Sequence, residues 1–97
     1  MFIWKIQNCH NGSVSEITRK AVAANYSHVL IKIANGIYSY NYDWEKNIDL
    51  VPPLSAALKS EGIEVWGWHY LFGDQPGQEA QKAISRIRQL GVDGYVL

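Results

Sequence analysis

The feature that most constrains the fold of this chain is a repeated order of helix, glycine and strand. It occurs at Glu61-Gly62-Ile63 and again at Leu90-Gly91-Val92. A glycine in the left-handed conformation commonly ends a helix, and an apolar residue after it can begin a strand. Residues 29–34 form an apolar run that only Lys32 interrupts, which is typical of a parallel strand covered on both faces. The sequence therefore predicts helices alternating with parallel strands.

The predicted elements fill the chain in the order β-α-β-α-β-α-β. Ser13 and Glu16 fit a capping box for the first helix, and Asp49 and Asp74 are predicted caps of the second and third. Strands are expected at residues 2–7, 29–34, 63–70 and 92–97, and the buried stripe of the third helix at Ala80, Ala83, Ile84, Ile87 and Leu90.

This order amounts to three βα units plus a fourth parallel strand. A complete eight-stranded α/β barrel takes about 250 residues, whereas this chain has 97. We therefore expect an α/β fold that is half of a (β/α)8 barrel, a single domain over residues 1–97 that is truncated after the fourth strand.

Charge and cysteine content narrow the function classes. Nine Lys and Arg balance nine Asp and Glu without a run of either sign, so nucleic acid is not an expected partner. Cys9 is the single cysteine, and Cys9 and His10 lack the spaced companions of a metal site, so neither a metal nor a cofactor is expected. The sequence has no apolar run of membrane-spanning length and no signal peptide, so no membrane partner is expected and the localisation stays open.

Candidate ligand-binding residues follow from the rule that ligands of such folds meet the carboxyl ends of the strands. Aromatic rings beside amide groups suit carbohydrate, because sugar C–H faces stack on rings while hydroxyl groups hydrogen-bond to amides. Alternatively, bulky aromatic residues fill a core, and the alternating Tyr38, Tyr40, Tyr42 and Trp44 also fit an ordinary strand or an interface arm. The predicted substrate-binding residues are Gln7, Asn8, Asn35, Tyr38, Trp68, His69 and Tyr70.

Three titratable residues in predicted strands allow two interpretations each. Lys32 is expected to point into the barrel and pair with a carboxylate, or else to be a reactive amine, and Lys5 has the same two options. His69 either binds or protonates a substrate, or is a hydrogen-bonded structural residue.

Glycoside hydrolysis usually needs two carboxylates about 5–9.5 Å apart. Glu16 and Glu79 lie on predicted helices, and Glu64 and Asp93 begin strands at the opposite end from the expected site. Of the remaining Asp43, Glu45, Asp49 and Asp74, the last two are explained as helix caps, so the sequence offers no convincing catalytic pair and the catalytic residues stay unassigned.

Two segments resemble parts of the family 25 glycoside hydrolases, which are lysozyme-like barrels. Ile31-Lys32-Ile33-Ala34 resembles one strand motif of that family, and Val65-Trp66-Gly67-Trp68-His69-Tyr70 resembles a later one. The resemblance implies a saccharide-binding ancestry. Gln7-Asn8 and Asn35 stand where the family carries acidic residues, and the family's main acidic motif follows the fourth strand, where this sequence ends. The chain alone is therefore expected to be inactive as a hydrolase, although a full-length parent would be one.

Three hypotheses follow from the sequence. The first is a half-barrel of glycoside hydrolase type that binds an oligosaccharide or a peptidoglycan fragment. The second is a folding module without a ligand, in which copies of the chain pair through exposed strand edges as a homo-oligomer. The third is an aldolase-like lyase that uses Lys32.

Overall fold

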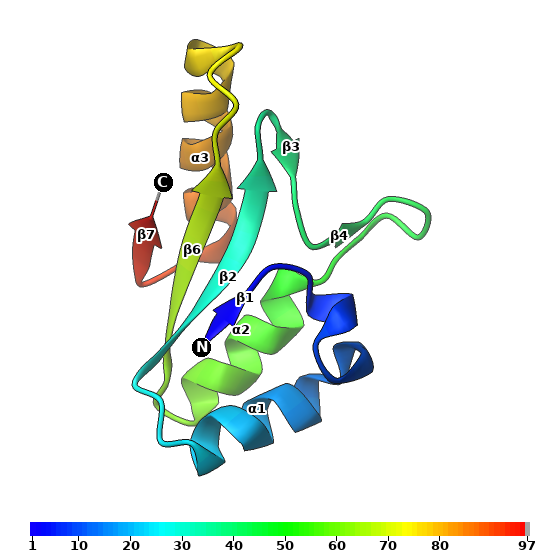
Figure 1. The fold of residues 1–97 in the computed structure, drawn as a ribbon, viewed down its shortest axis with the longest axis vertical. Coiled ribbons are helices and arrows are strands. Elements are labelled where there is room, and N and C mark those ends of the chain that lie inside the picture. The colour runs from blue at the N-terminus through cyan, green and yellow to red at the C-terminus, as the bar shows by residue number, and fades with distance from the viewer. Residues whose placement is uncertain (97) are drawn as a thin grey trace.

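The computed structural model describes residues 1–96 and shows an α/β fold with a mostly parallel sheet (Figure 1). Four parallel strands lie side by side in chain order: β1 (Phe2–Ile3), β2 (His28–Asn35), β6 (Glu64–Tyr70) and β7 (Gly94–Val96). Three helices connect them: α1 (Val14–Ala23), α2 (Val51–Ser60) and α3 (Pro76–Leu90). The predicted α/β class and the alternation of strands and helices are confirmed. Leu97, predicted to end the fourth strand, lies outside the described residues.

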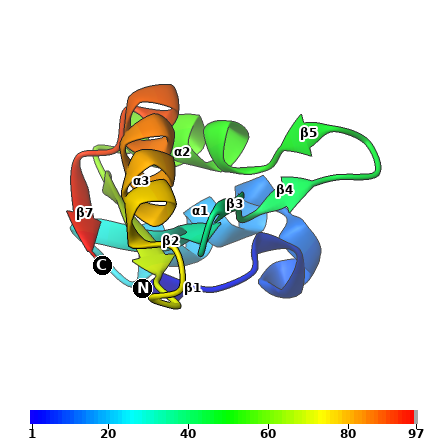
Figure 2. The same ribbon diagram turned by 90° about the horizontal axis from the view of Figure 1, so that it is seen from above.

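The helices lie on one side of the sheet (Figure 2). Because side chains alternate between the two faces of a strand, β2 turns Val29, Ile31 and Ile33 toward the helices. These side chains are fully buried in one apolar core with Ile17 of α1 and Leu54 of α2. Among residues 1–96, no helix covers the opposite face of the sheet.

Two short hairpins occupy the connection between β2 and α2, where the alternating aromatic residues from Tyr38 to Trp44 allowed an ordinary strand or an interface arm. β3 (Tyr38–Ser39) folds back antiparallel onto the end of β2. β4 (Tyr42–Asp43) and β5 (Ile48–Asp49) pair with each other in a separate two-stranded sheet. Figures 1 and 2 show that this second hairpin, residues 42–49, projects from the rest of the molecule, and we call it the arm.

The strand predicted at residues 2–7 is wrong in its second half. β1 ends at Ile3, and two short 3-10 helices follow, η1 (Ile6–Asn8) and η2 (His10–Gly12). The backbone N–H of Ile6 donates to the side-chain oxygen of Asn41 at 2.7 Å instead of continuing along the sheet.

Asn41 is the buried residue that joins this turn to the sheet. Besides accepting from Ile6, its side-chain amide donates to the carbonyl oxygens of Trp4 (3.0 Å) and Lys32 (2.7 Å). Its φ of 55° lies in the left-handed region, which asparagine tolerates better than most residues. One side chain therefore fixes the ends of β1 and β2 and the root of the arm.

The helix ends follow the predicted signals in part. Ser13 caps α1 by accepting from the N–H of Glu16 at 3.3 Å, and Gly62 and Gly91 adopt the predicted positive φ, 75° and 56°. The Glu16 side chain pairs with Arg19 at 2.9 Å rather than reaching back to Ser13. Leu50, and not the predicted Asp49, stands at the cap position of α2, but the Asp49 carboxylate accepts from the N–H of Val51 at 3.2 Å.

For the third helix, the predicted cap is wrong and the predicted buried stripe is right only in part. The residue before α3 is Gln75, without a side-chain cap, so Asp74 does not cap this helix. Of the predicted buried stripe, Ala83 is buried and Ile87 and Leu90 are half-buried, whereas Ala80 is exposed and Ile84 is 51% exposed. The buried face includes Glu79 and Arg86 instead, because both side chains bond to backbone at the end of the sheet.

Replacing Asn41 tests this account of the fold. The variant Asn41→Ala leaves the Ile6 N–H and two carbonyl groups without their partner, and we expect a loss of about 3 kcal/mol in unfolding free energy. Urea denaturation measures it. Asn11→Ala is the matched control, because Asn11 has a similar φ of 56° but is exposed, so it reports the cost of the left-handed backbone alone. Equal losses in the two variants would contradict a structural role of the Asn41 hydrogen bonds.

Candidate functional site

The sheet face without helices carries a continuous row of aromatic side chains. Phe2 and Trp4 each contact Trp68, with ring centroids 4.9 Å apart in both pairs. Trp4 also lies 6.5 Å from Tyr70, which packs edge-on against Phe72 at 5.3 Å. Trp68 is buried, but the others are widely exposed, from 46% for Tyr70 to 57% for Phe2. We call these five residues the aromatic surface.

Strand alternation and register place these rings together. Phe2 and Trp4 are two residues apart, as are Trp68 and Tyr70, so each pair points to one face of the sheet. In the parallel register, Phe2 aligns with Leu30 of β2, and Trp68 of β6 aligns with Lys32. Phe72 extends the row beyond the end of β6 by lying on Gly36, where an added Cβ would come within 2.6 Å of the ring.

Lys32 lies in the middle of the aromatic surface. Its ammonium group is 4.2 Å from the ring centroid of Trp4 and 4.1 Å from that of Tyr40, with Trp68 and Tyr70 at 5.3 and 5.5 Å. Such contacts are cation–π interactions, which stabilise the charged amine in place of water. The residue is only 2% exposed, and burial lowers the pKa of its ammonium group.

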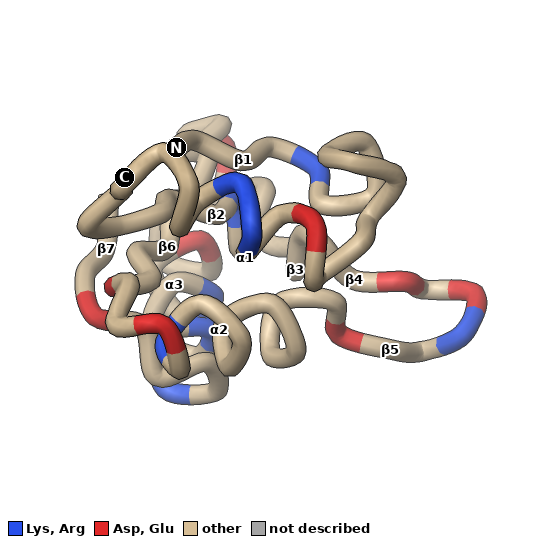
Figure 3. Tube along the Cα trace, turned by 90° about the horizontal axis from the view of Figure 1, so that it is seen from below, with Lys and Arg blue, Asp and Glu red and all other residues tan. Residues whose placement is uncertain are grey.

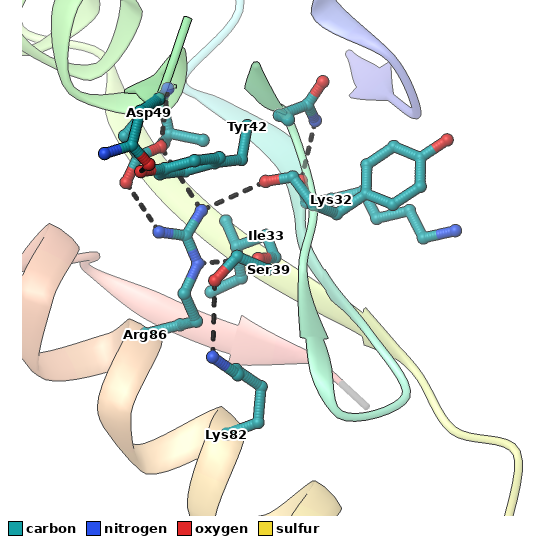
Figure 4. Close-up of polar contacts among 11 residues, drawn as sticks. Lys32, Ile33, Ser39, Tyr42, Asp49, Lys82 and Arg86 are labelled. Carbon is teal, nitrogen blue, oxygen red and sulfur yellow. Dashed lines mark hydrogen bonds and ion pairs between the residues drawn. The ribbon is translucent and has the colours of Figure 1, made fainter. Parts of the chain in front are cut away.

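The predicted pairing of Lys32 with a carboxylate is wrong. Within residues 1–96, the ion pairs join Arg19 to Glu16 and Arg86 to Asp49. Figure 4 shows that the Lys32 side chain points away from the Arg86 network, on the other side of β2. Lys5, for which the same pairing was expected, follows β1 as an exposed residue.

Arg86 of α3 binds the end of β2 to the arm (Figure 4). Its guanidinium donates to Asp49 of β5 at 2.6 Å, to the carbonyl oxygen of Ile33 at 2.7 Å and to that of Tyr40 at 3.1 Å. The Arg86 side chain is fully buried, so these contacts replace its hydration. Nearby, Lys82 of the same helix donates to the hydroxyl of Ser39 at 3.4 Å.

His69, a predicted substrate-binding residue, is enclosed on the helix side of the sheet. Its Nε2 donates to the carbonyl oxygen of Gly36 at 2.7 Å, because a carbonyl can only accept. Its Nδ1 accepts from the Tyr95 hydroxyl at 2.6 Å, and burial raises the pKa of Tyr95 to about 12, which keeps that hydroxyl protonated. A ligand would have to displace Tyr95 or Gly36 to reach the imidazole.

The other predicted binding residues divide into separate places. Trp68 and Tyr70 belong to the aromatic surface, and Asn35 aligns with Tyr70 in the register of β2 and β6. The Trp68 indole donates to the carbonyl oxygen of Ile3 at 3.1 Å, which leaves its ring as the contact surface. Tyr38 is exposed at the rim of a small hollow of about 150 Å³ beside Phe72.

Gln7 and Asn8 are both exposed on η1, but they line different depressions. Gln7 faces a pocket beneath the arm, with Tyr40 and Trp44 on its other walls. Asn8 borders a shallow hollow with Phe2 and Trp4. The seven predicted residues therefore form no single cluster.

Sequence reasoning missed four important residues. Phe2 and Trp4 are not among the predicted binding residues, although their spacing of two, which places them beside Trp68, is visible in the sequence. Asn41 and Arg86 carry no local signal, because their partners lie 35 and 37 residues away.

Glu79 was set aside as a helix residue, yet its carboxylate lies at the carboxyl end of β6. It accepts from the N–H groups of Phe72 at 2.8 Å and Gly73 at 3.0 Å, so both oxygens are occupied by the loop. It therefore fixes the segment that holds the Phe72 ring, at the edge of the aromatic surface.

Residues 1–96 contain no cluster of His, Cys, Asp and Glu that could hold a metal ion. None of the helices in this range is long and apolar enough to cross a membrane. Charged residues of both signs are spread along the chain (Figure 3). Comparison with models of protein families, with curated proteins and with solved structures finds no match to this chain. The aromatic surface and its neighbouring pockets are therefore interpreted from their own chemistry.

The lysine within the aromatic surface gives a pH-dependent prediction. The pKa of Lys32 is lower in the folded chain than in the unfolded chain. As the pH rises toward the ordinary value of 10.5, the unfolded chain therefore keeps more protons bound than the folded chain does. The contribution of Lys32 to the unfolding free energy accordingly rises with pH over this window. The variant Lys32→Met keeps a long side chain without the charge. We expect any stability advantage of this variant to shrink as the pH approaches 10.5 in denaturation experiments.

Lys20→Met, at an exposed position of α1, controls for the loss of one positive charge. The same pH dependence in both variants would show that the environment of Lys32 has no effect on its titration.

Proposed function

We propose that the chain is the N-terminal half of a glycoside-hydrolase-like (β/α)8 barrel and that its aromatic surface binds saccharide. Two features support the barrel. The parallel strands lie in the order β1, β2, β6, β7, which is chain order, and the helices lie on one side of the sheet. In a (β/α)8 barrel each strand neighbours the next along the chain and the helices form the outer ring. The uncovered face would then be the interior side, where a complete barrel packs strand residues such as Phe2 and Trp68 in its core and leaves Tyr70 and Phe72, at the carboxyl end of β6, open to a ligand.

The observation that carries the saccharide proposal is the exposed row of rings from Phe2 to Phe72. Folded proteins rarely leave a contiguous apolar patch open unless it binds something. Aromatic faces with polar groups at their edges suit sugar rings, because C–H groups pack on the rings and hydroxyl groups hydrogen-bond at the edges. Asn35 and the Tyr70 hydroxyl supply such groups near the carboxyl ends of β2 and β6.

The proposal concerns binding and assigns no hydrolytic residue. Glu79, the buried acid nearest to Phe72 along the chain, uses both carboxylate oxygens to hold the loop. Asp49, near the end of β2, is held by Arg86. A hydrolase would need a carboxylate free to exchange a proton on either side of the scissile bond.

Titration with N-acetylglucosamine oligomers tests saccharide binding. We expect the amide NMR signals of Trp4 and Tyr70 and the indole signal of Trp4 to shift. Trp4→Ala or Tyr70→Ala should weaken binding about tenfold, which corresponds to roughly 1.4 kcal/mol of lost ring contact. Tyr26→Ala is the control, because Tyr26 is 43% exposed but lies before β2, at the other end of the sheet. Absent shifts, or equal weakening by all three variants, would overturn the proposal.

A second function is favoured by the exposed apolar area itself and by the sheet edges. β1 and β7 each have one sheet neighbour, so each leaves one edge open to pairing with a second copy, next to the exposed aromatic face. In this alternative, two copies of the chain cover each other's aromatic surface and the protein is an assembly module without a ligand.

The molar mass in solution separates the two functions. If the chain is an assembly module, light scattering should give a dimer or larger species, and Trp4→Ala should shift it toward the monomer. Oligomers of N-acetylglucosamine should leave that mass unchanged. A monomeric wild-type chain at all accessible concentrations would exclude self-assembly and leave the aromatic surface open for a ligand.

A further inference from the structure

A second pocket lies between η1 and the arm, apart from the row of rings on the sheet. It has a volume of about 190 Å³, and Lys5, Gln7, Tyr40, Tyr42 and Trp44 contribute to its walls. The first two residues follow β1 and the others follow β2, so the pocket joins the carboxyl ends of two neighbouring parallel strands. We call it the arm pocket.

The wall formed by the arm is held in place from both ends. At the start, Asn41 is bonded to the end of β1 and to β2, and at the end Asp49 is paired with Arg86. Within the arm, the Tyr42 hydroxyl donates to the side chain of Asn47 at 2.6 Å. The pocket is therefore formed before a ligand arrives, which reduces the entropy cost of binding.

Tyr42 and Trp44 present a ring platform on the arm. Their centroids are 4.4 Å apart with an interplanar angle of 45°, and Trp44 is 63% exposed. Tryptophan and tyrosine are the side chains most often found as anchors in binding sites, and here both belong to one hairpin.

Charge gives the pocket its chemical preference. Lys5 is the one charged side chain among the described residues that line it, and the ion pairs of residues 1–96 leave Lys5 without a carboxylate partner. The neighbouring acid Asp43 is absent from the pocket lining, and its Oδ1 accepts from the N–H groups of Glu45 and Lys46 in the turn of the arm. The walls thus combine aromatic rings, the Gln7 amide and one free cation.

We propose that the arm pocket binds a single sugar unit that carries a carboxylate. The ring lies on Trp44 and Tyr42, the carboxylate pairs with Lys5, and Gln7 hydrogen-bonds to hydroxyl groups. The volume suits one small unit, since sites for larger ligands measure about 300–1,000 Å³. This inference rests on the proposed saccharide function and adds to it the charge of the sugar and the position of one subsite.

Titration of the chain with glucuronate and with glucose, followed by NMR, tests the inference. Glucuronate should shift the Trp44 indole signal and bind at least tenfold more tightly than glucose, with a preference that weakens as salt is added. Lys5→Gln should abolish the preference and leave weak binding of both sugars, whereas Trp44→Ala should abolish binding of both. Lys20→Gln and Tyr26→Ala, at exposed positions away from the pocket, should change neither.

Parallel titration with neutral N-acetylglucosamine oligomers separates this inference from the proposed function. If the oligomers bind at Trp4 and Tyr70 while glucuronate leaves Trp44 unshifted, the arm pocket is not an acidic-sugar site and the saccharide surface stands. If glucuronate shifts Trp44 in a Lys5-dependent manner while the oligomers do not bind, the arm pocket stands and the aromatic surface has another role. Absence of both responses overturns both proposals.

Discussion

The side chain of Asn41 is the interaction on which the functional end of this molecule depends. Its amide joins the backbone of Trp4, Ile6 and Lys32, so the ends of two parallel strands and the root of the arm are fixed by one buried group. Its hydrogen bond with the Ile6 N–H takes the place of a sheet hydrogen bond, so β1 ends at Ile3 and the chain turns away from the sheet. Trp4 and Lys32, which meet in the aromatic surface, and Gln7, which lines the arm pocket, are all positioned through this residue or its immediate neighbours.

The two faces of the sheet accommodate buried charged and polar side chains in different ways. The helix side is a closed apolar core, where Arg86 and His69 are tolerated because every polar contact that they need is supplied by backbone or by Asp49 and Tyr95. The open side keeps its one buried charge, Lys32, among aromatic rings instead of beside a carboxylate. A cation held in this way adds polarity to an otherwise apolar surface without a counter-charge.

Local sequence signals predicted the strands around residues 29–34 and 63–70, the cap at Ser13 and the left-handed glycines at Gly62 and Gly91, because each depends on neighbours within a few residues. The errors have a different origin. The strand at 2–7 ends early because Asn41, 35 residues away, takes the Ile6 N–H, and the face of α3 is shifted because Arg86 finds Asp49 only in the folded chain. At the candidate site, the rule that ligands meet the carboxyl ends of strands selected Trp68 and Tyr70 but also His69, whose side chain points to the opposite face. The pairing predicted for Lys32 failed because no local pattern shows which rings surround an amine.

The two anchors of the arm, Asn41 and Asp49, stand at its base rather than in its tip. Residues 43–48 between them therefore contribute little to the hydrogen-bonded framework of the sheet, and sequence or length changes there should leave folding intact. This separation makes the hairpin an interchangeable recognition element. Laboratory libraries, or natural divergence, could retarget the molecule by exchanging a handful of tip residues while the scaffold that orients them is inherited unchanged.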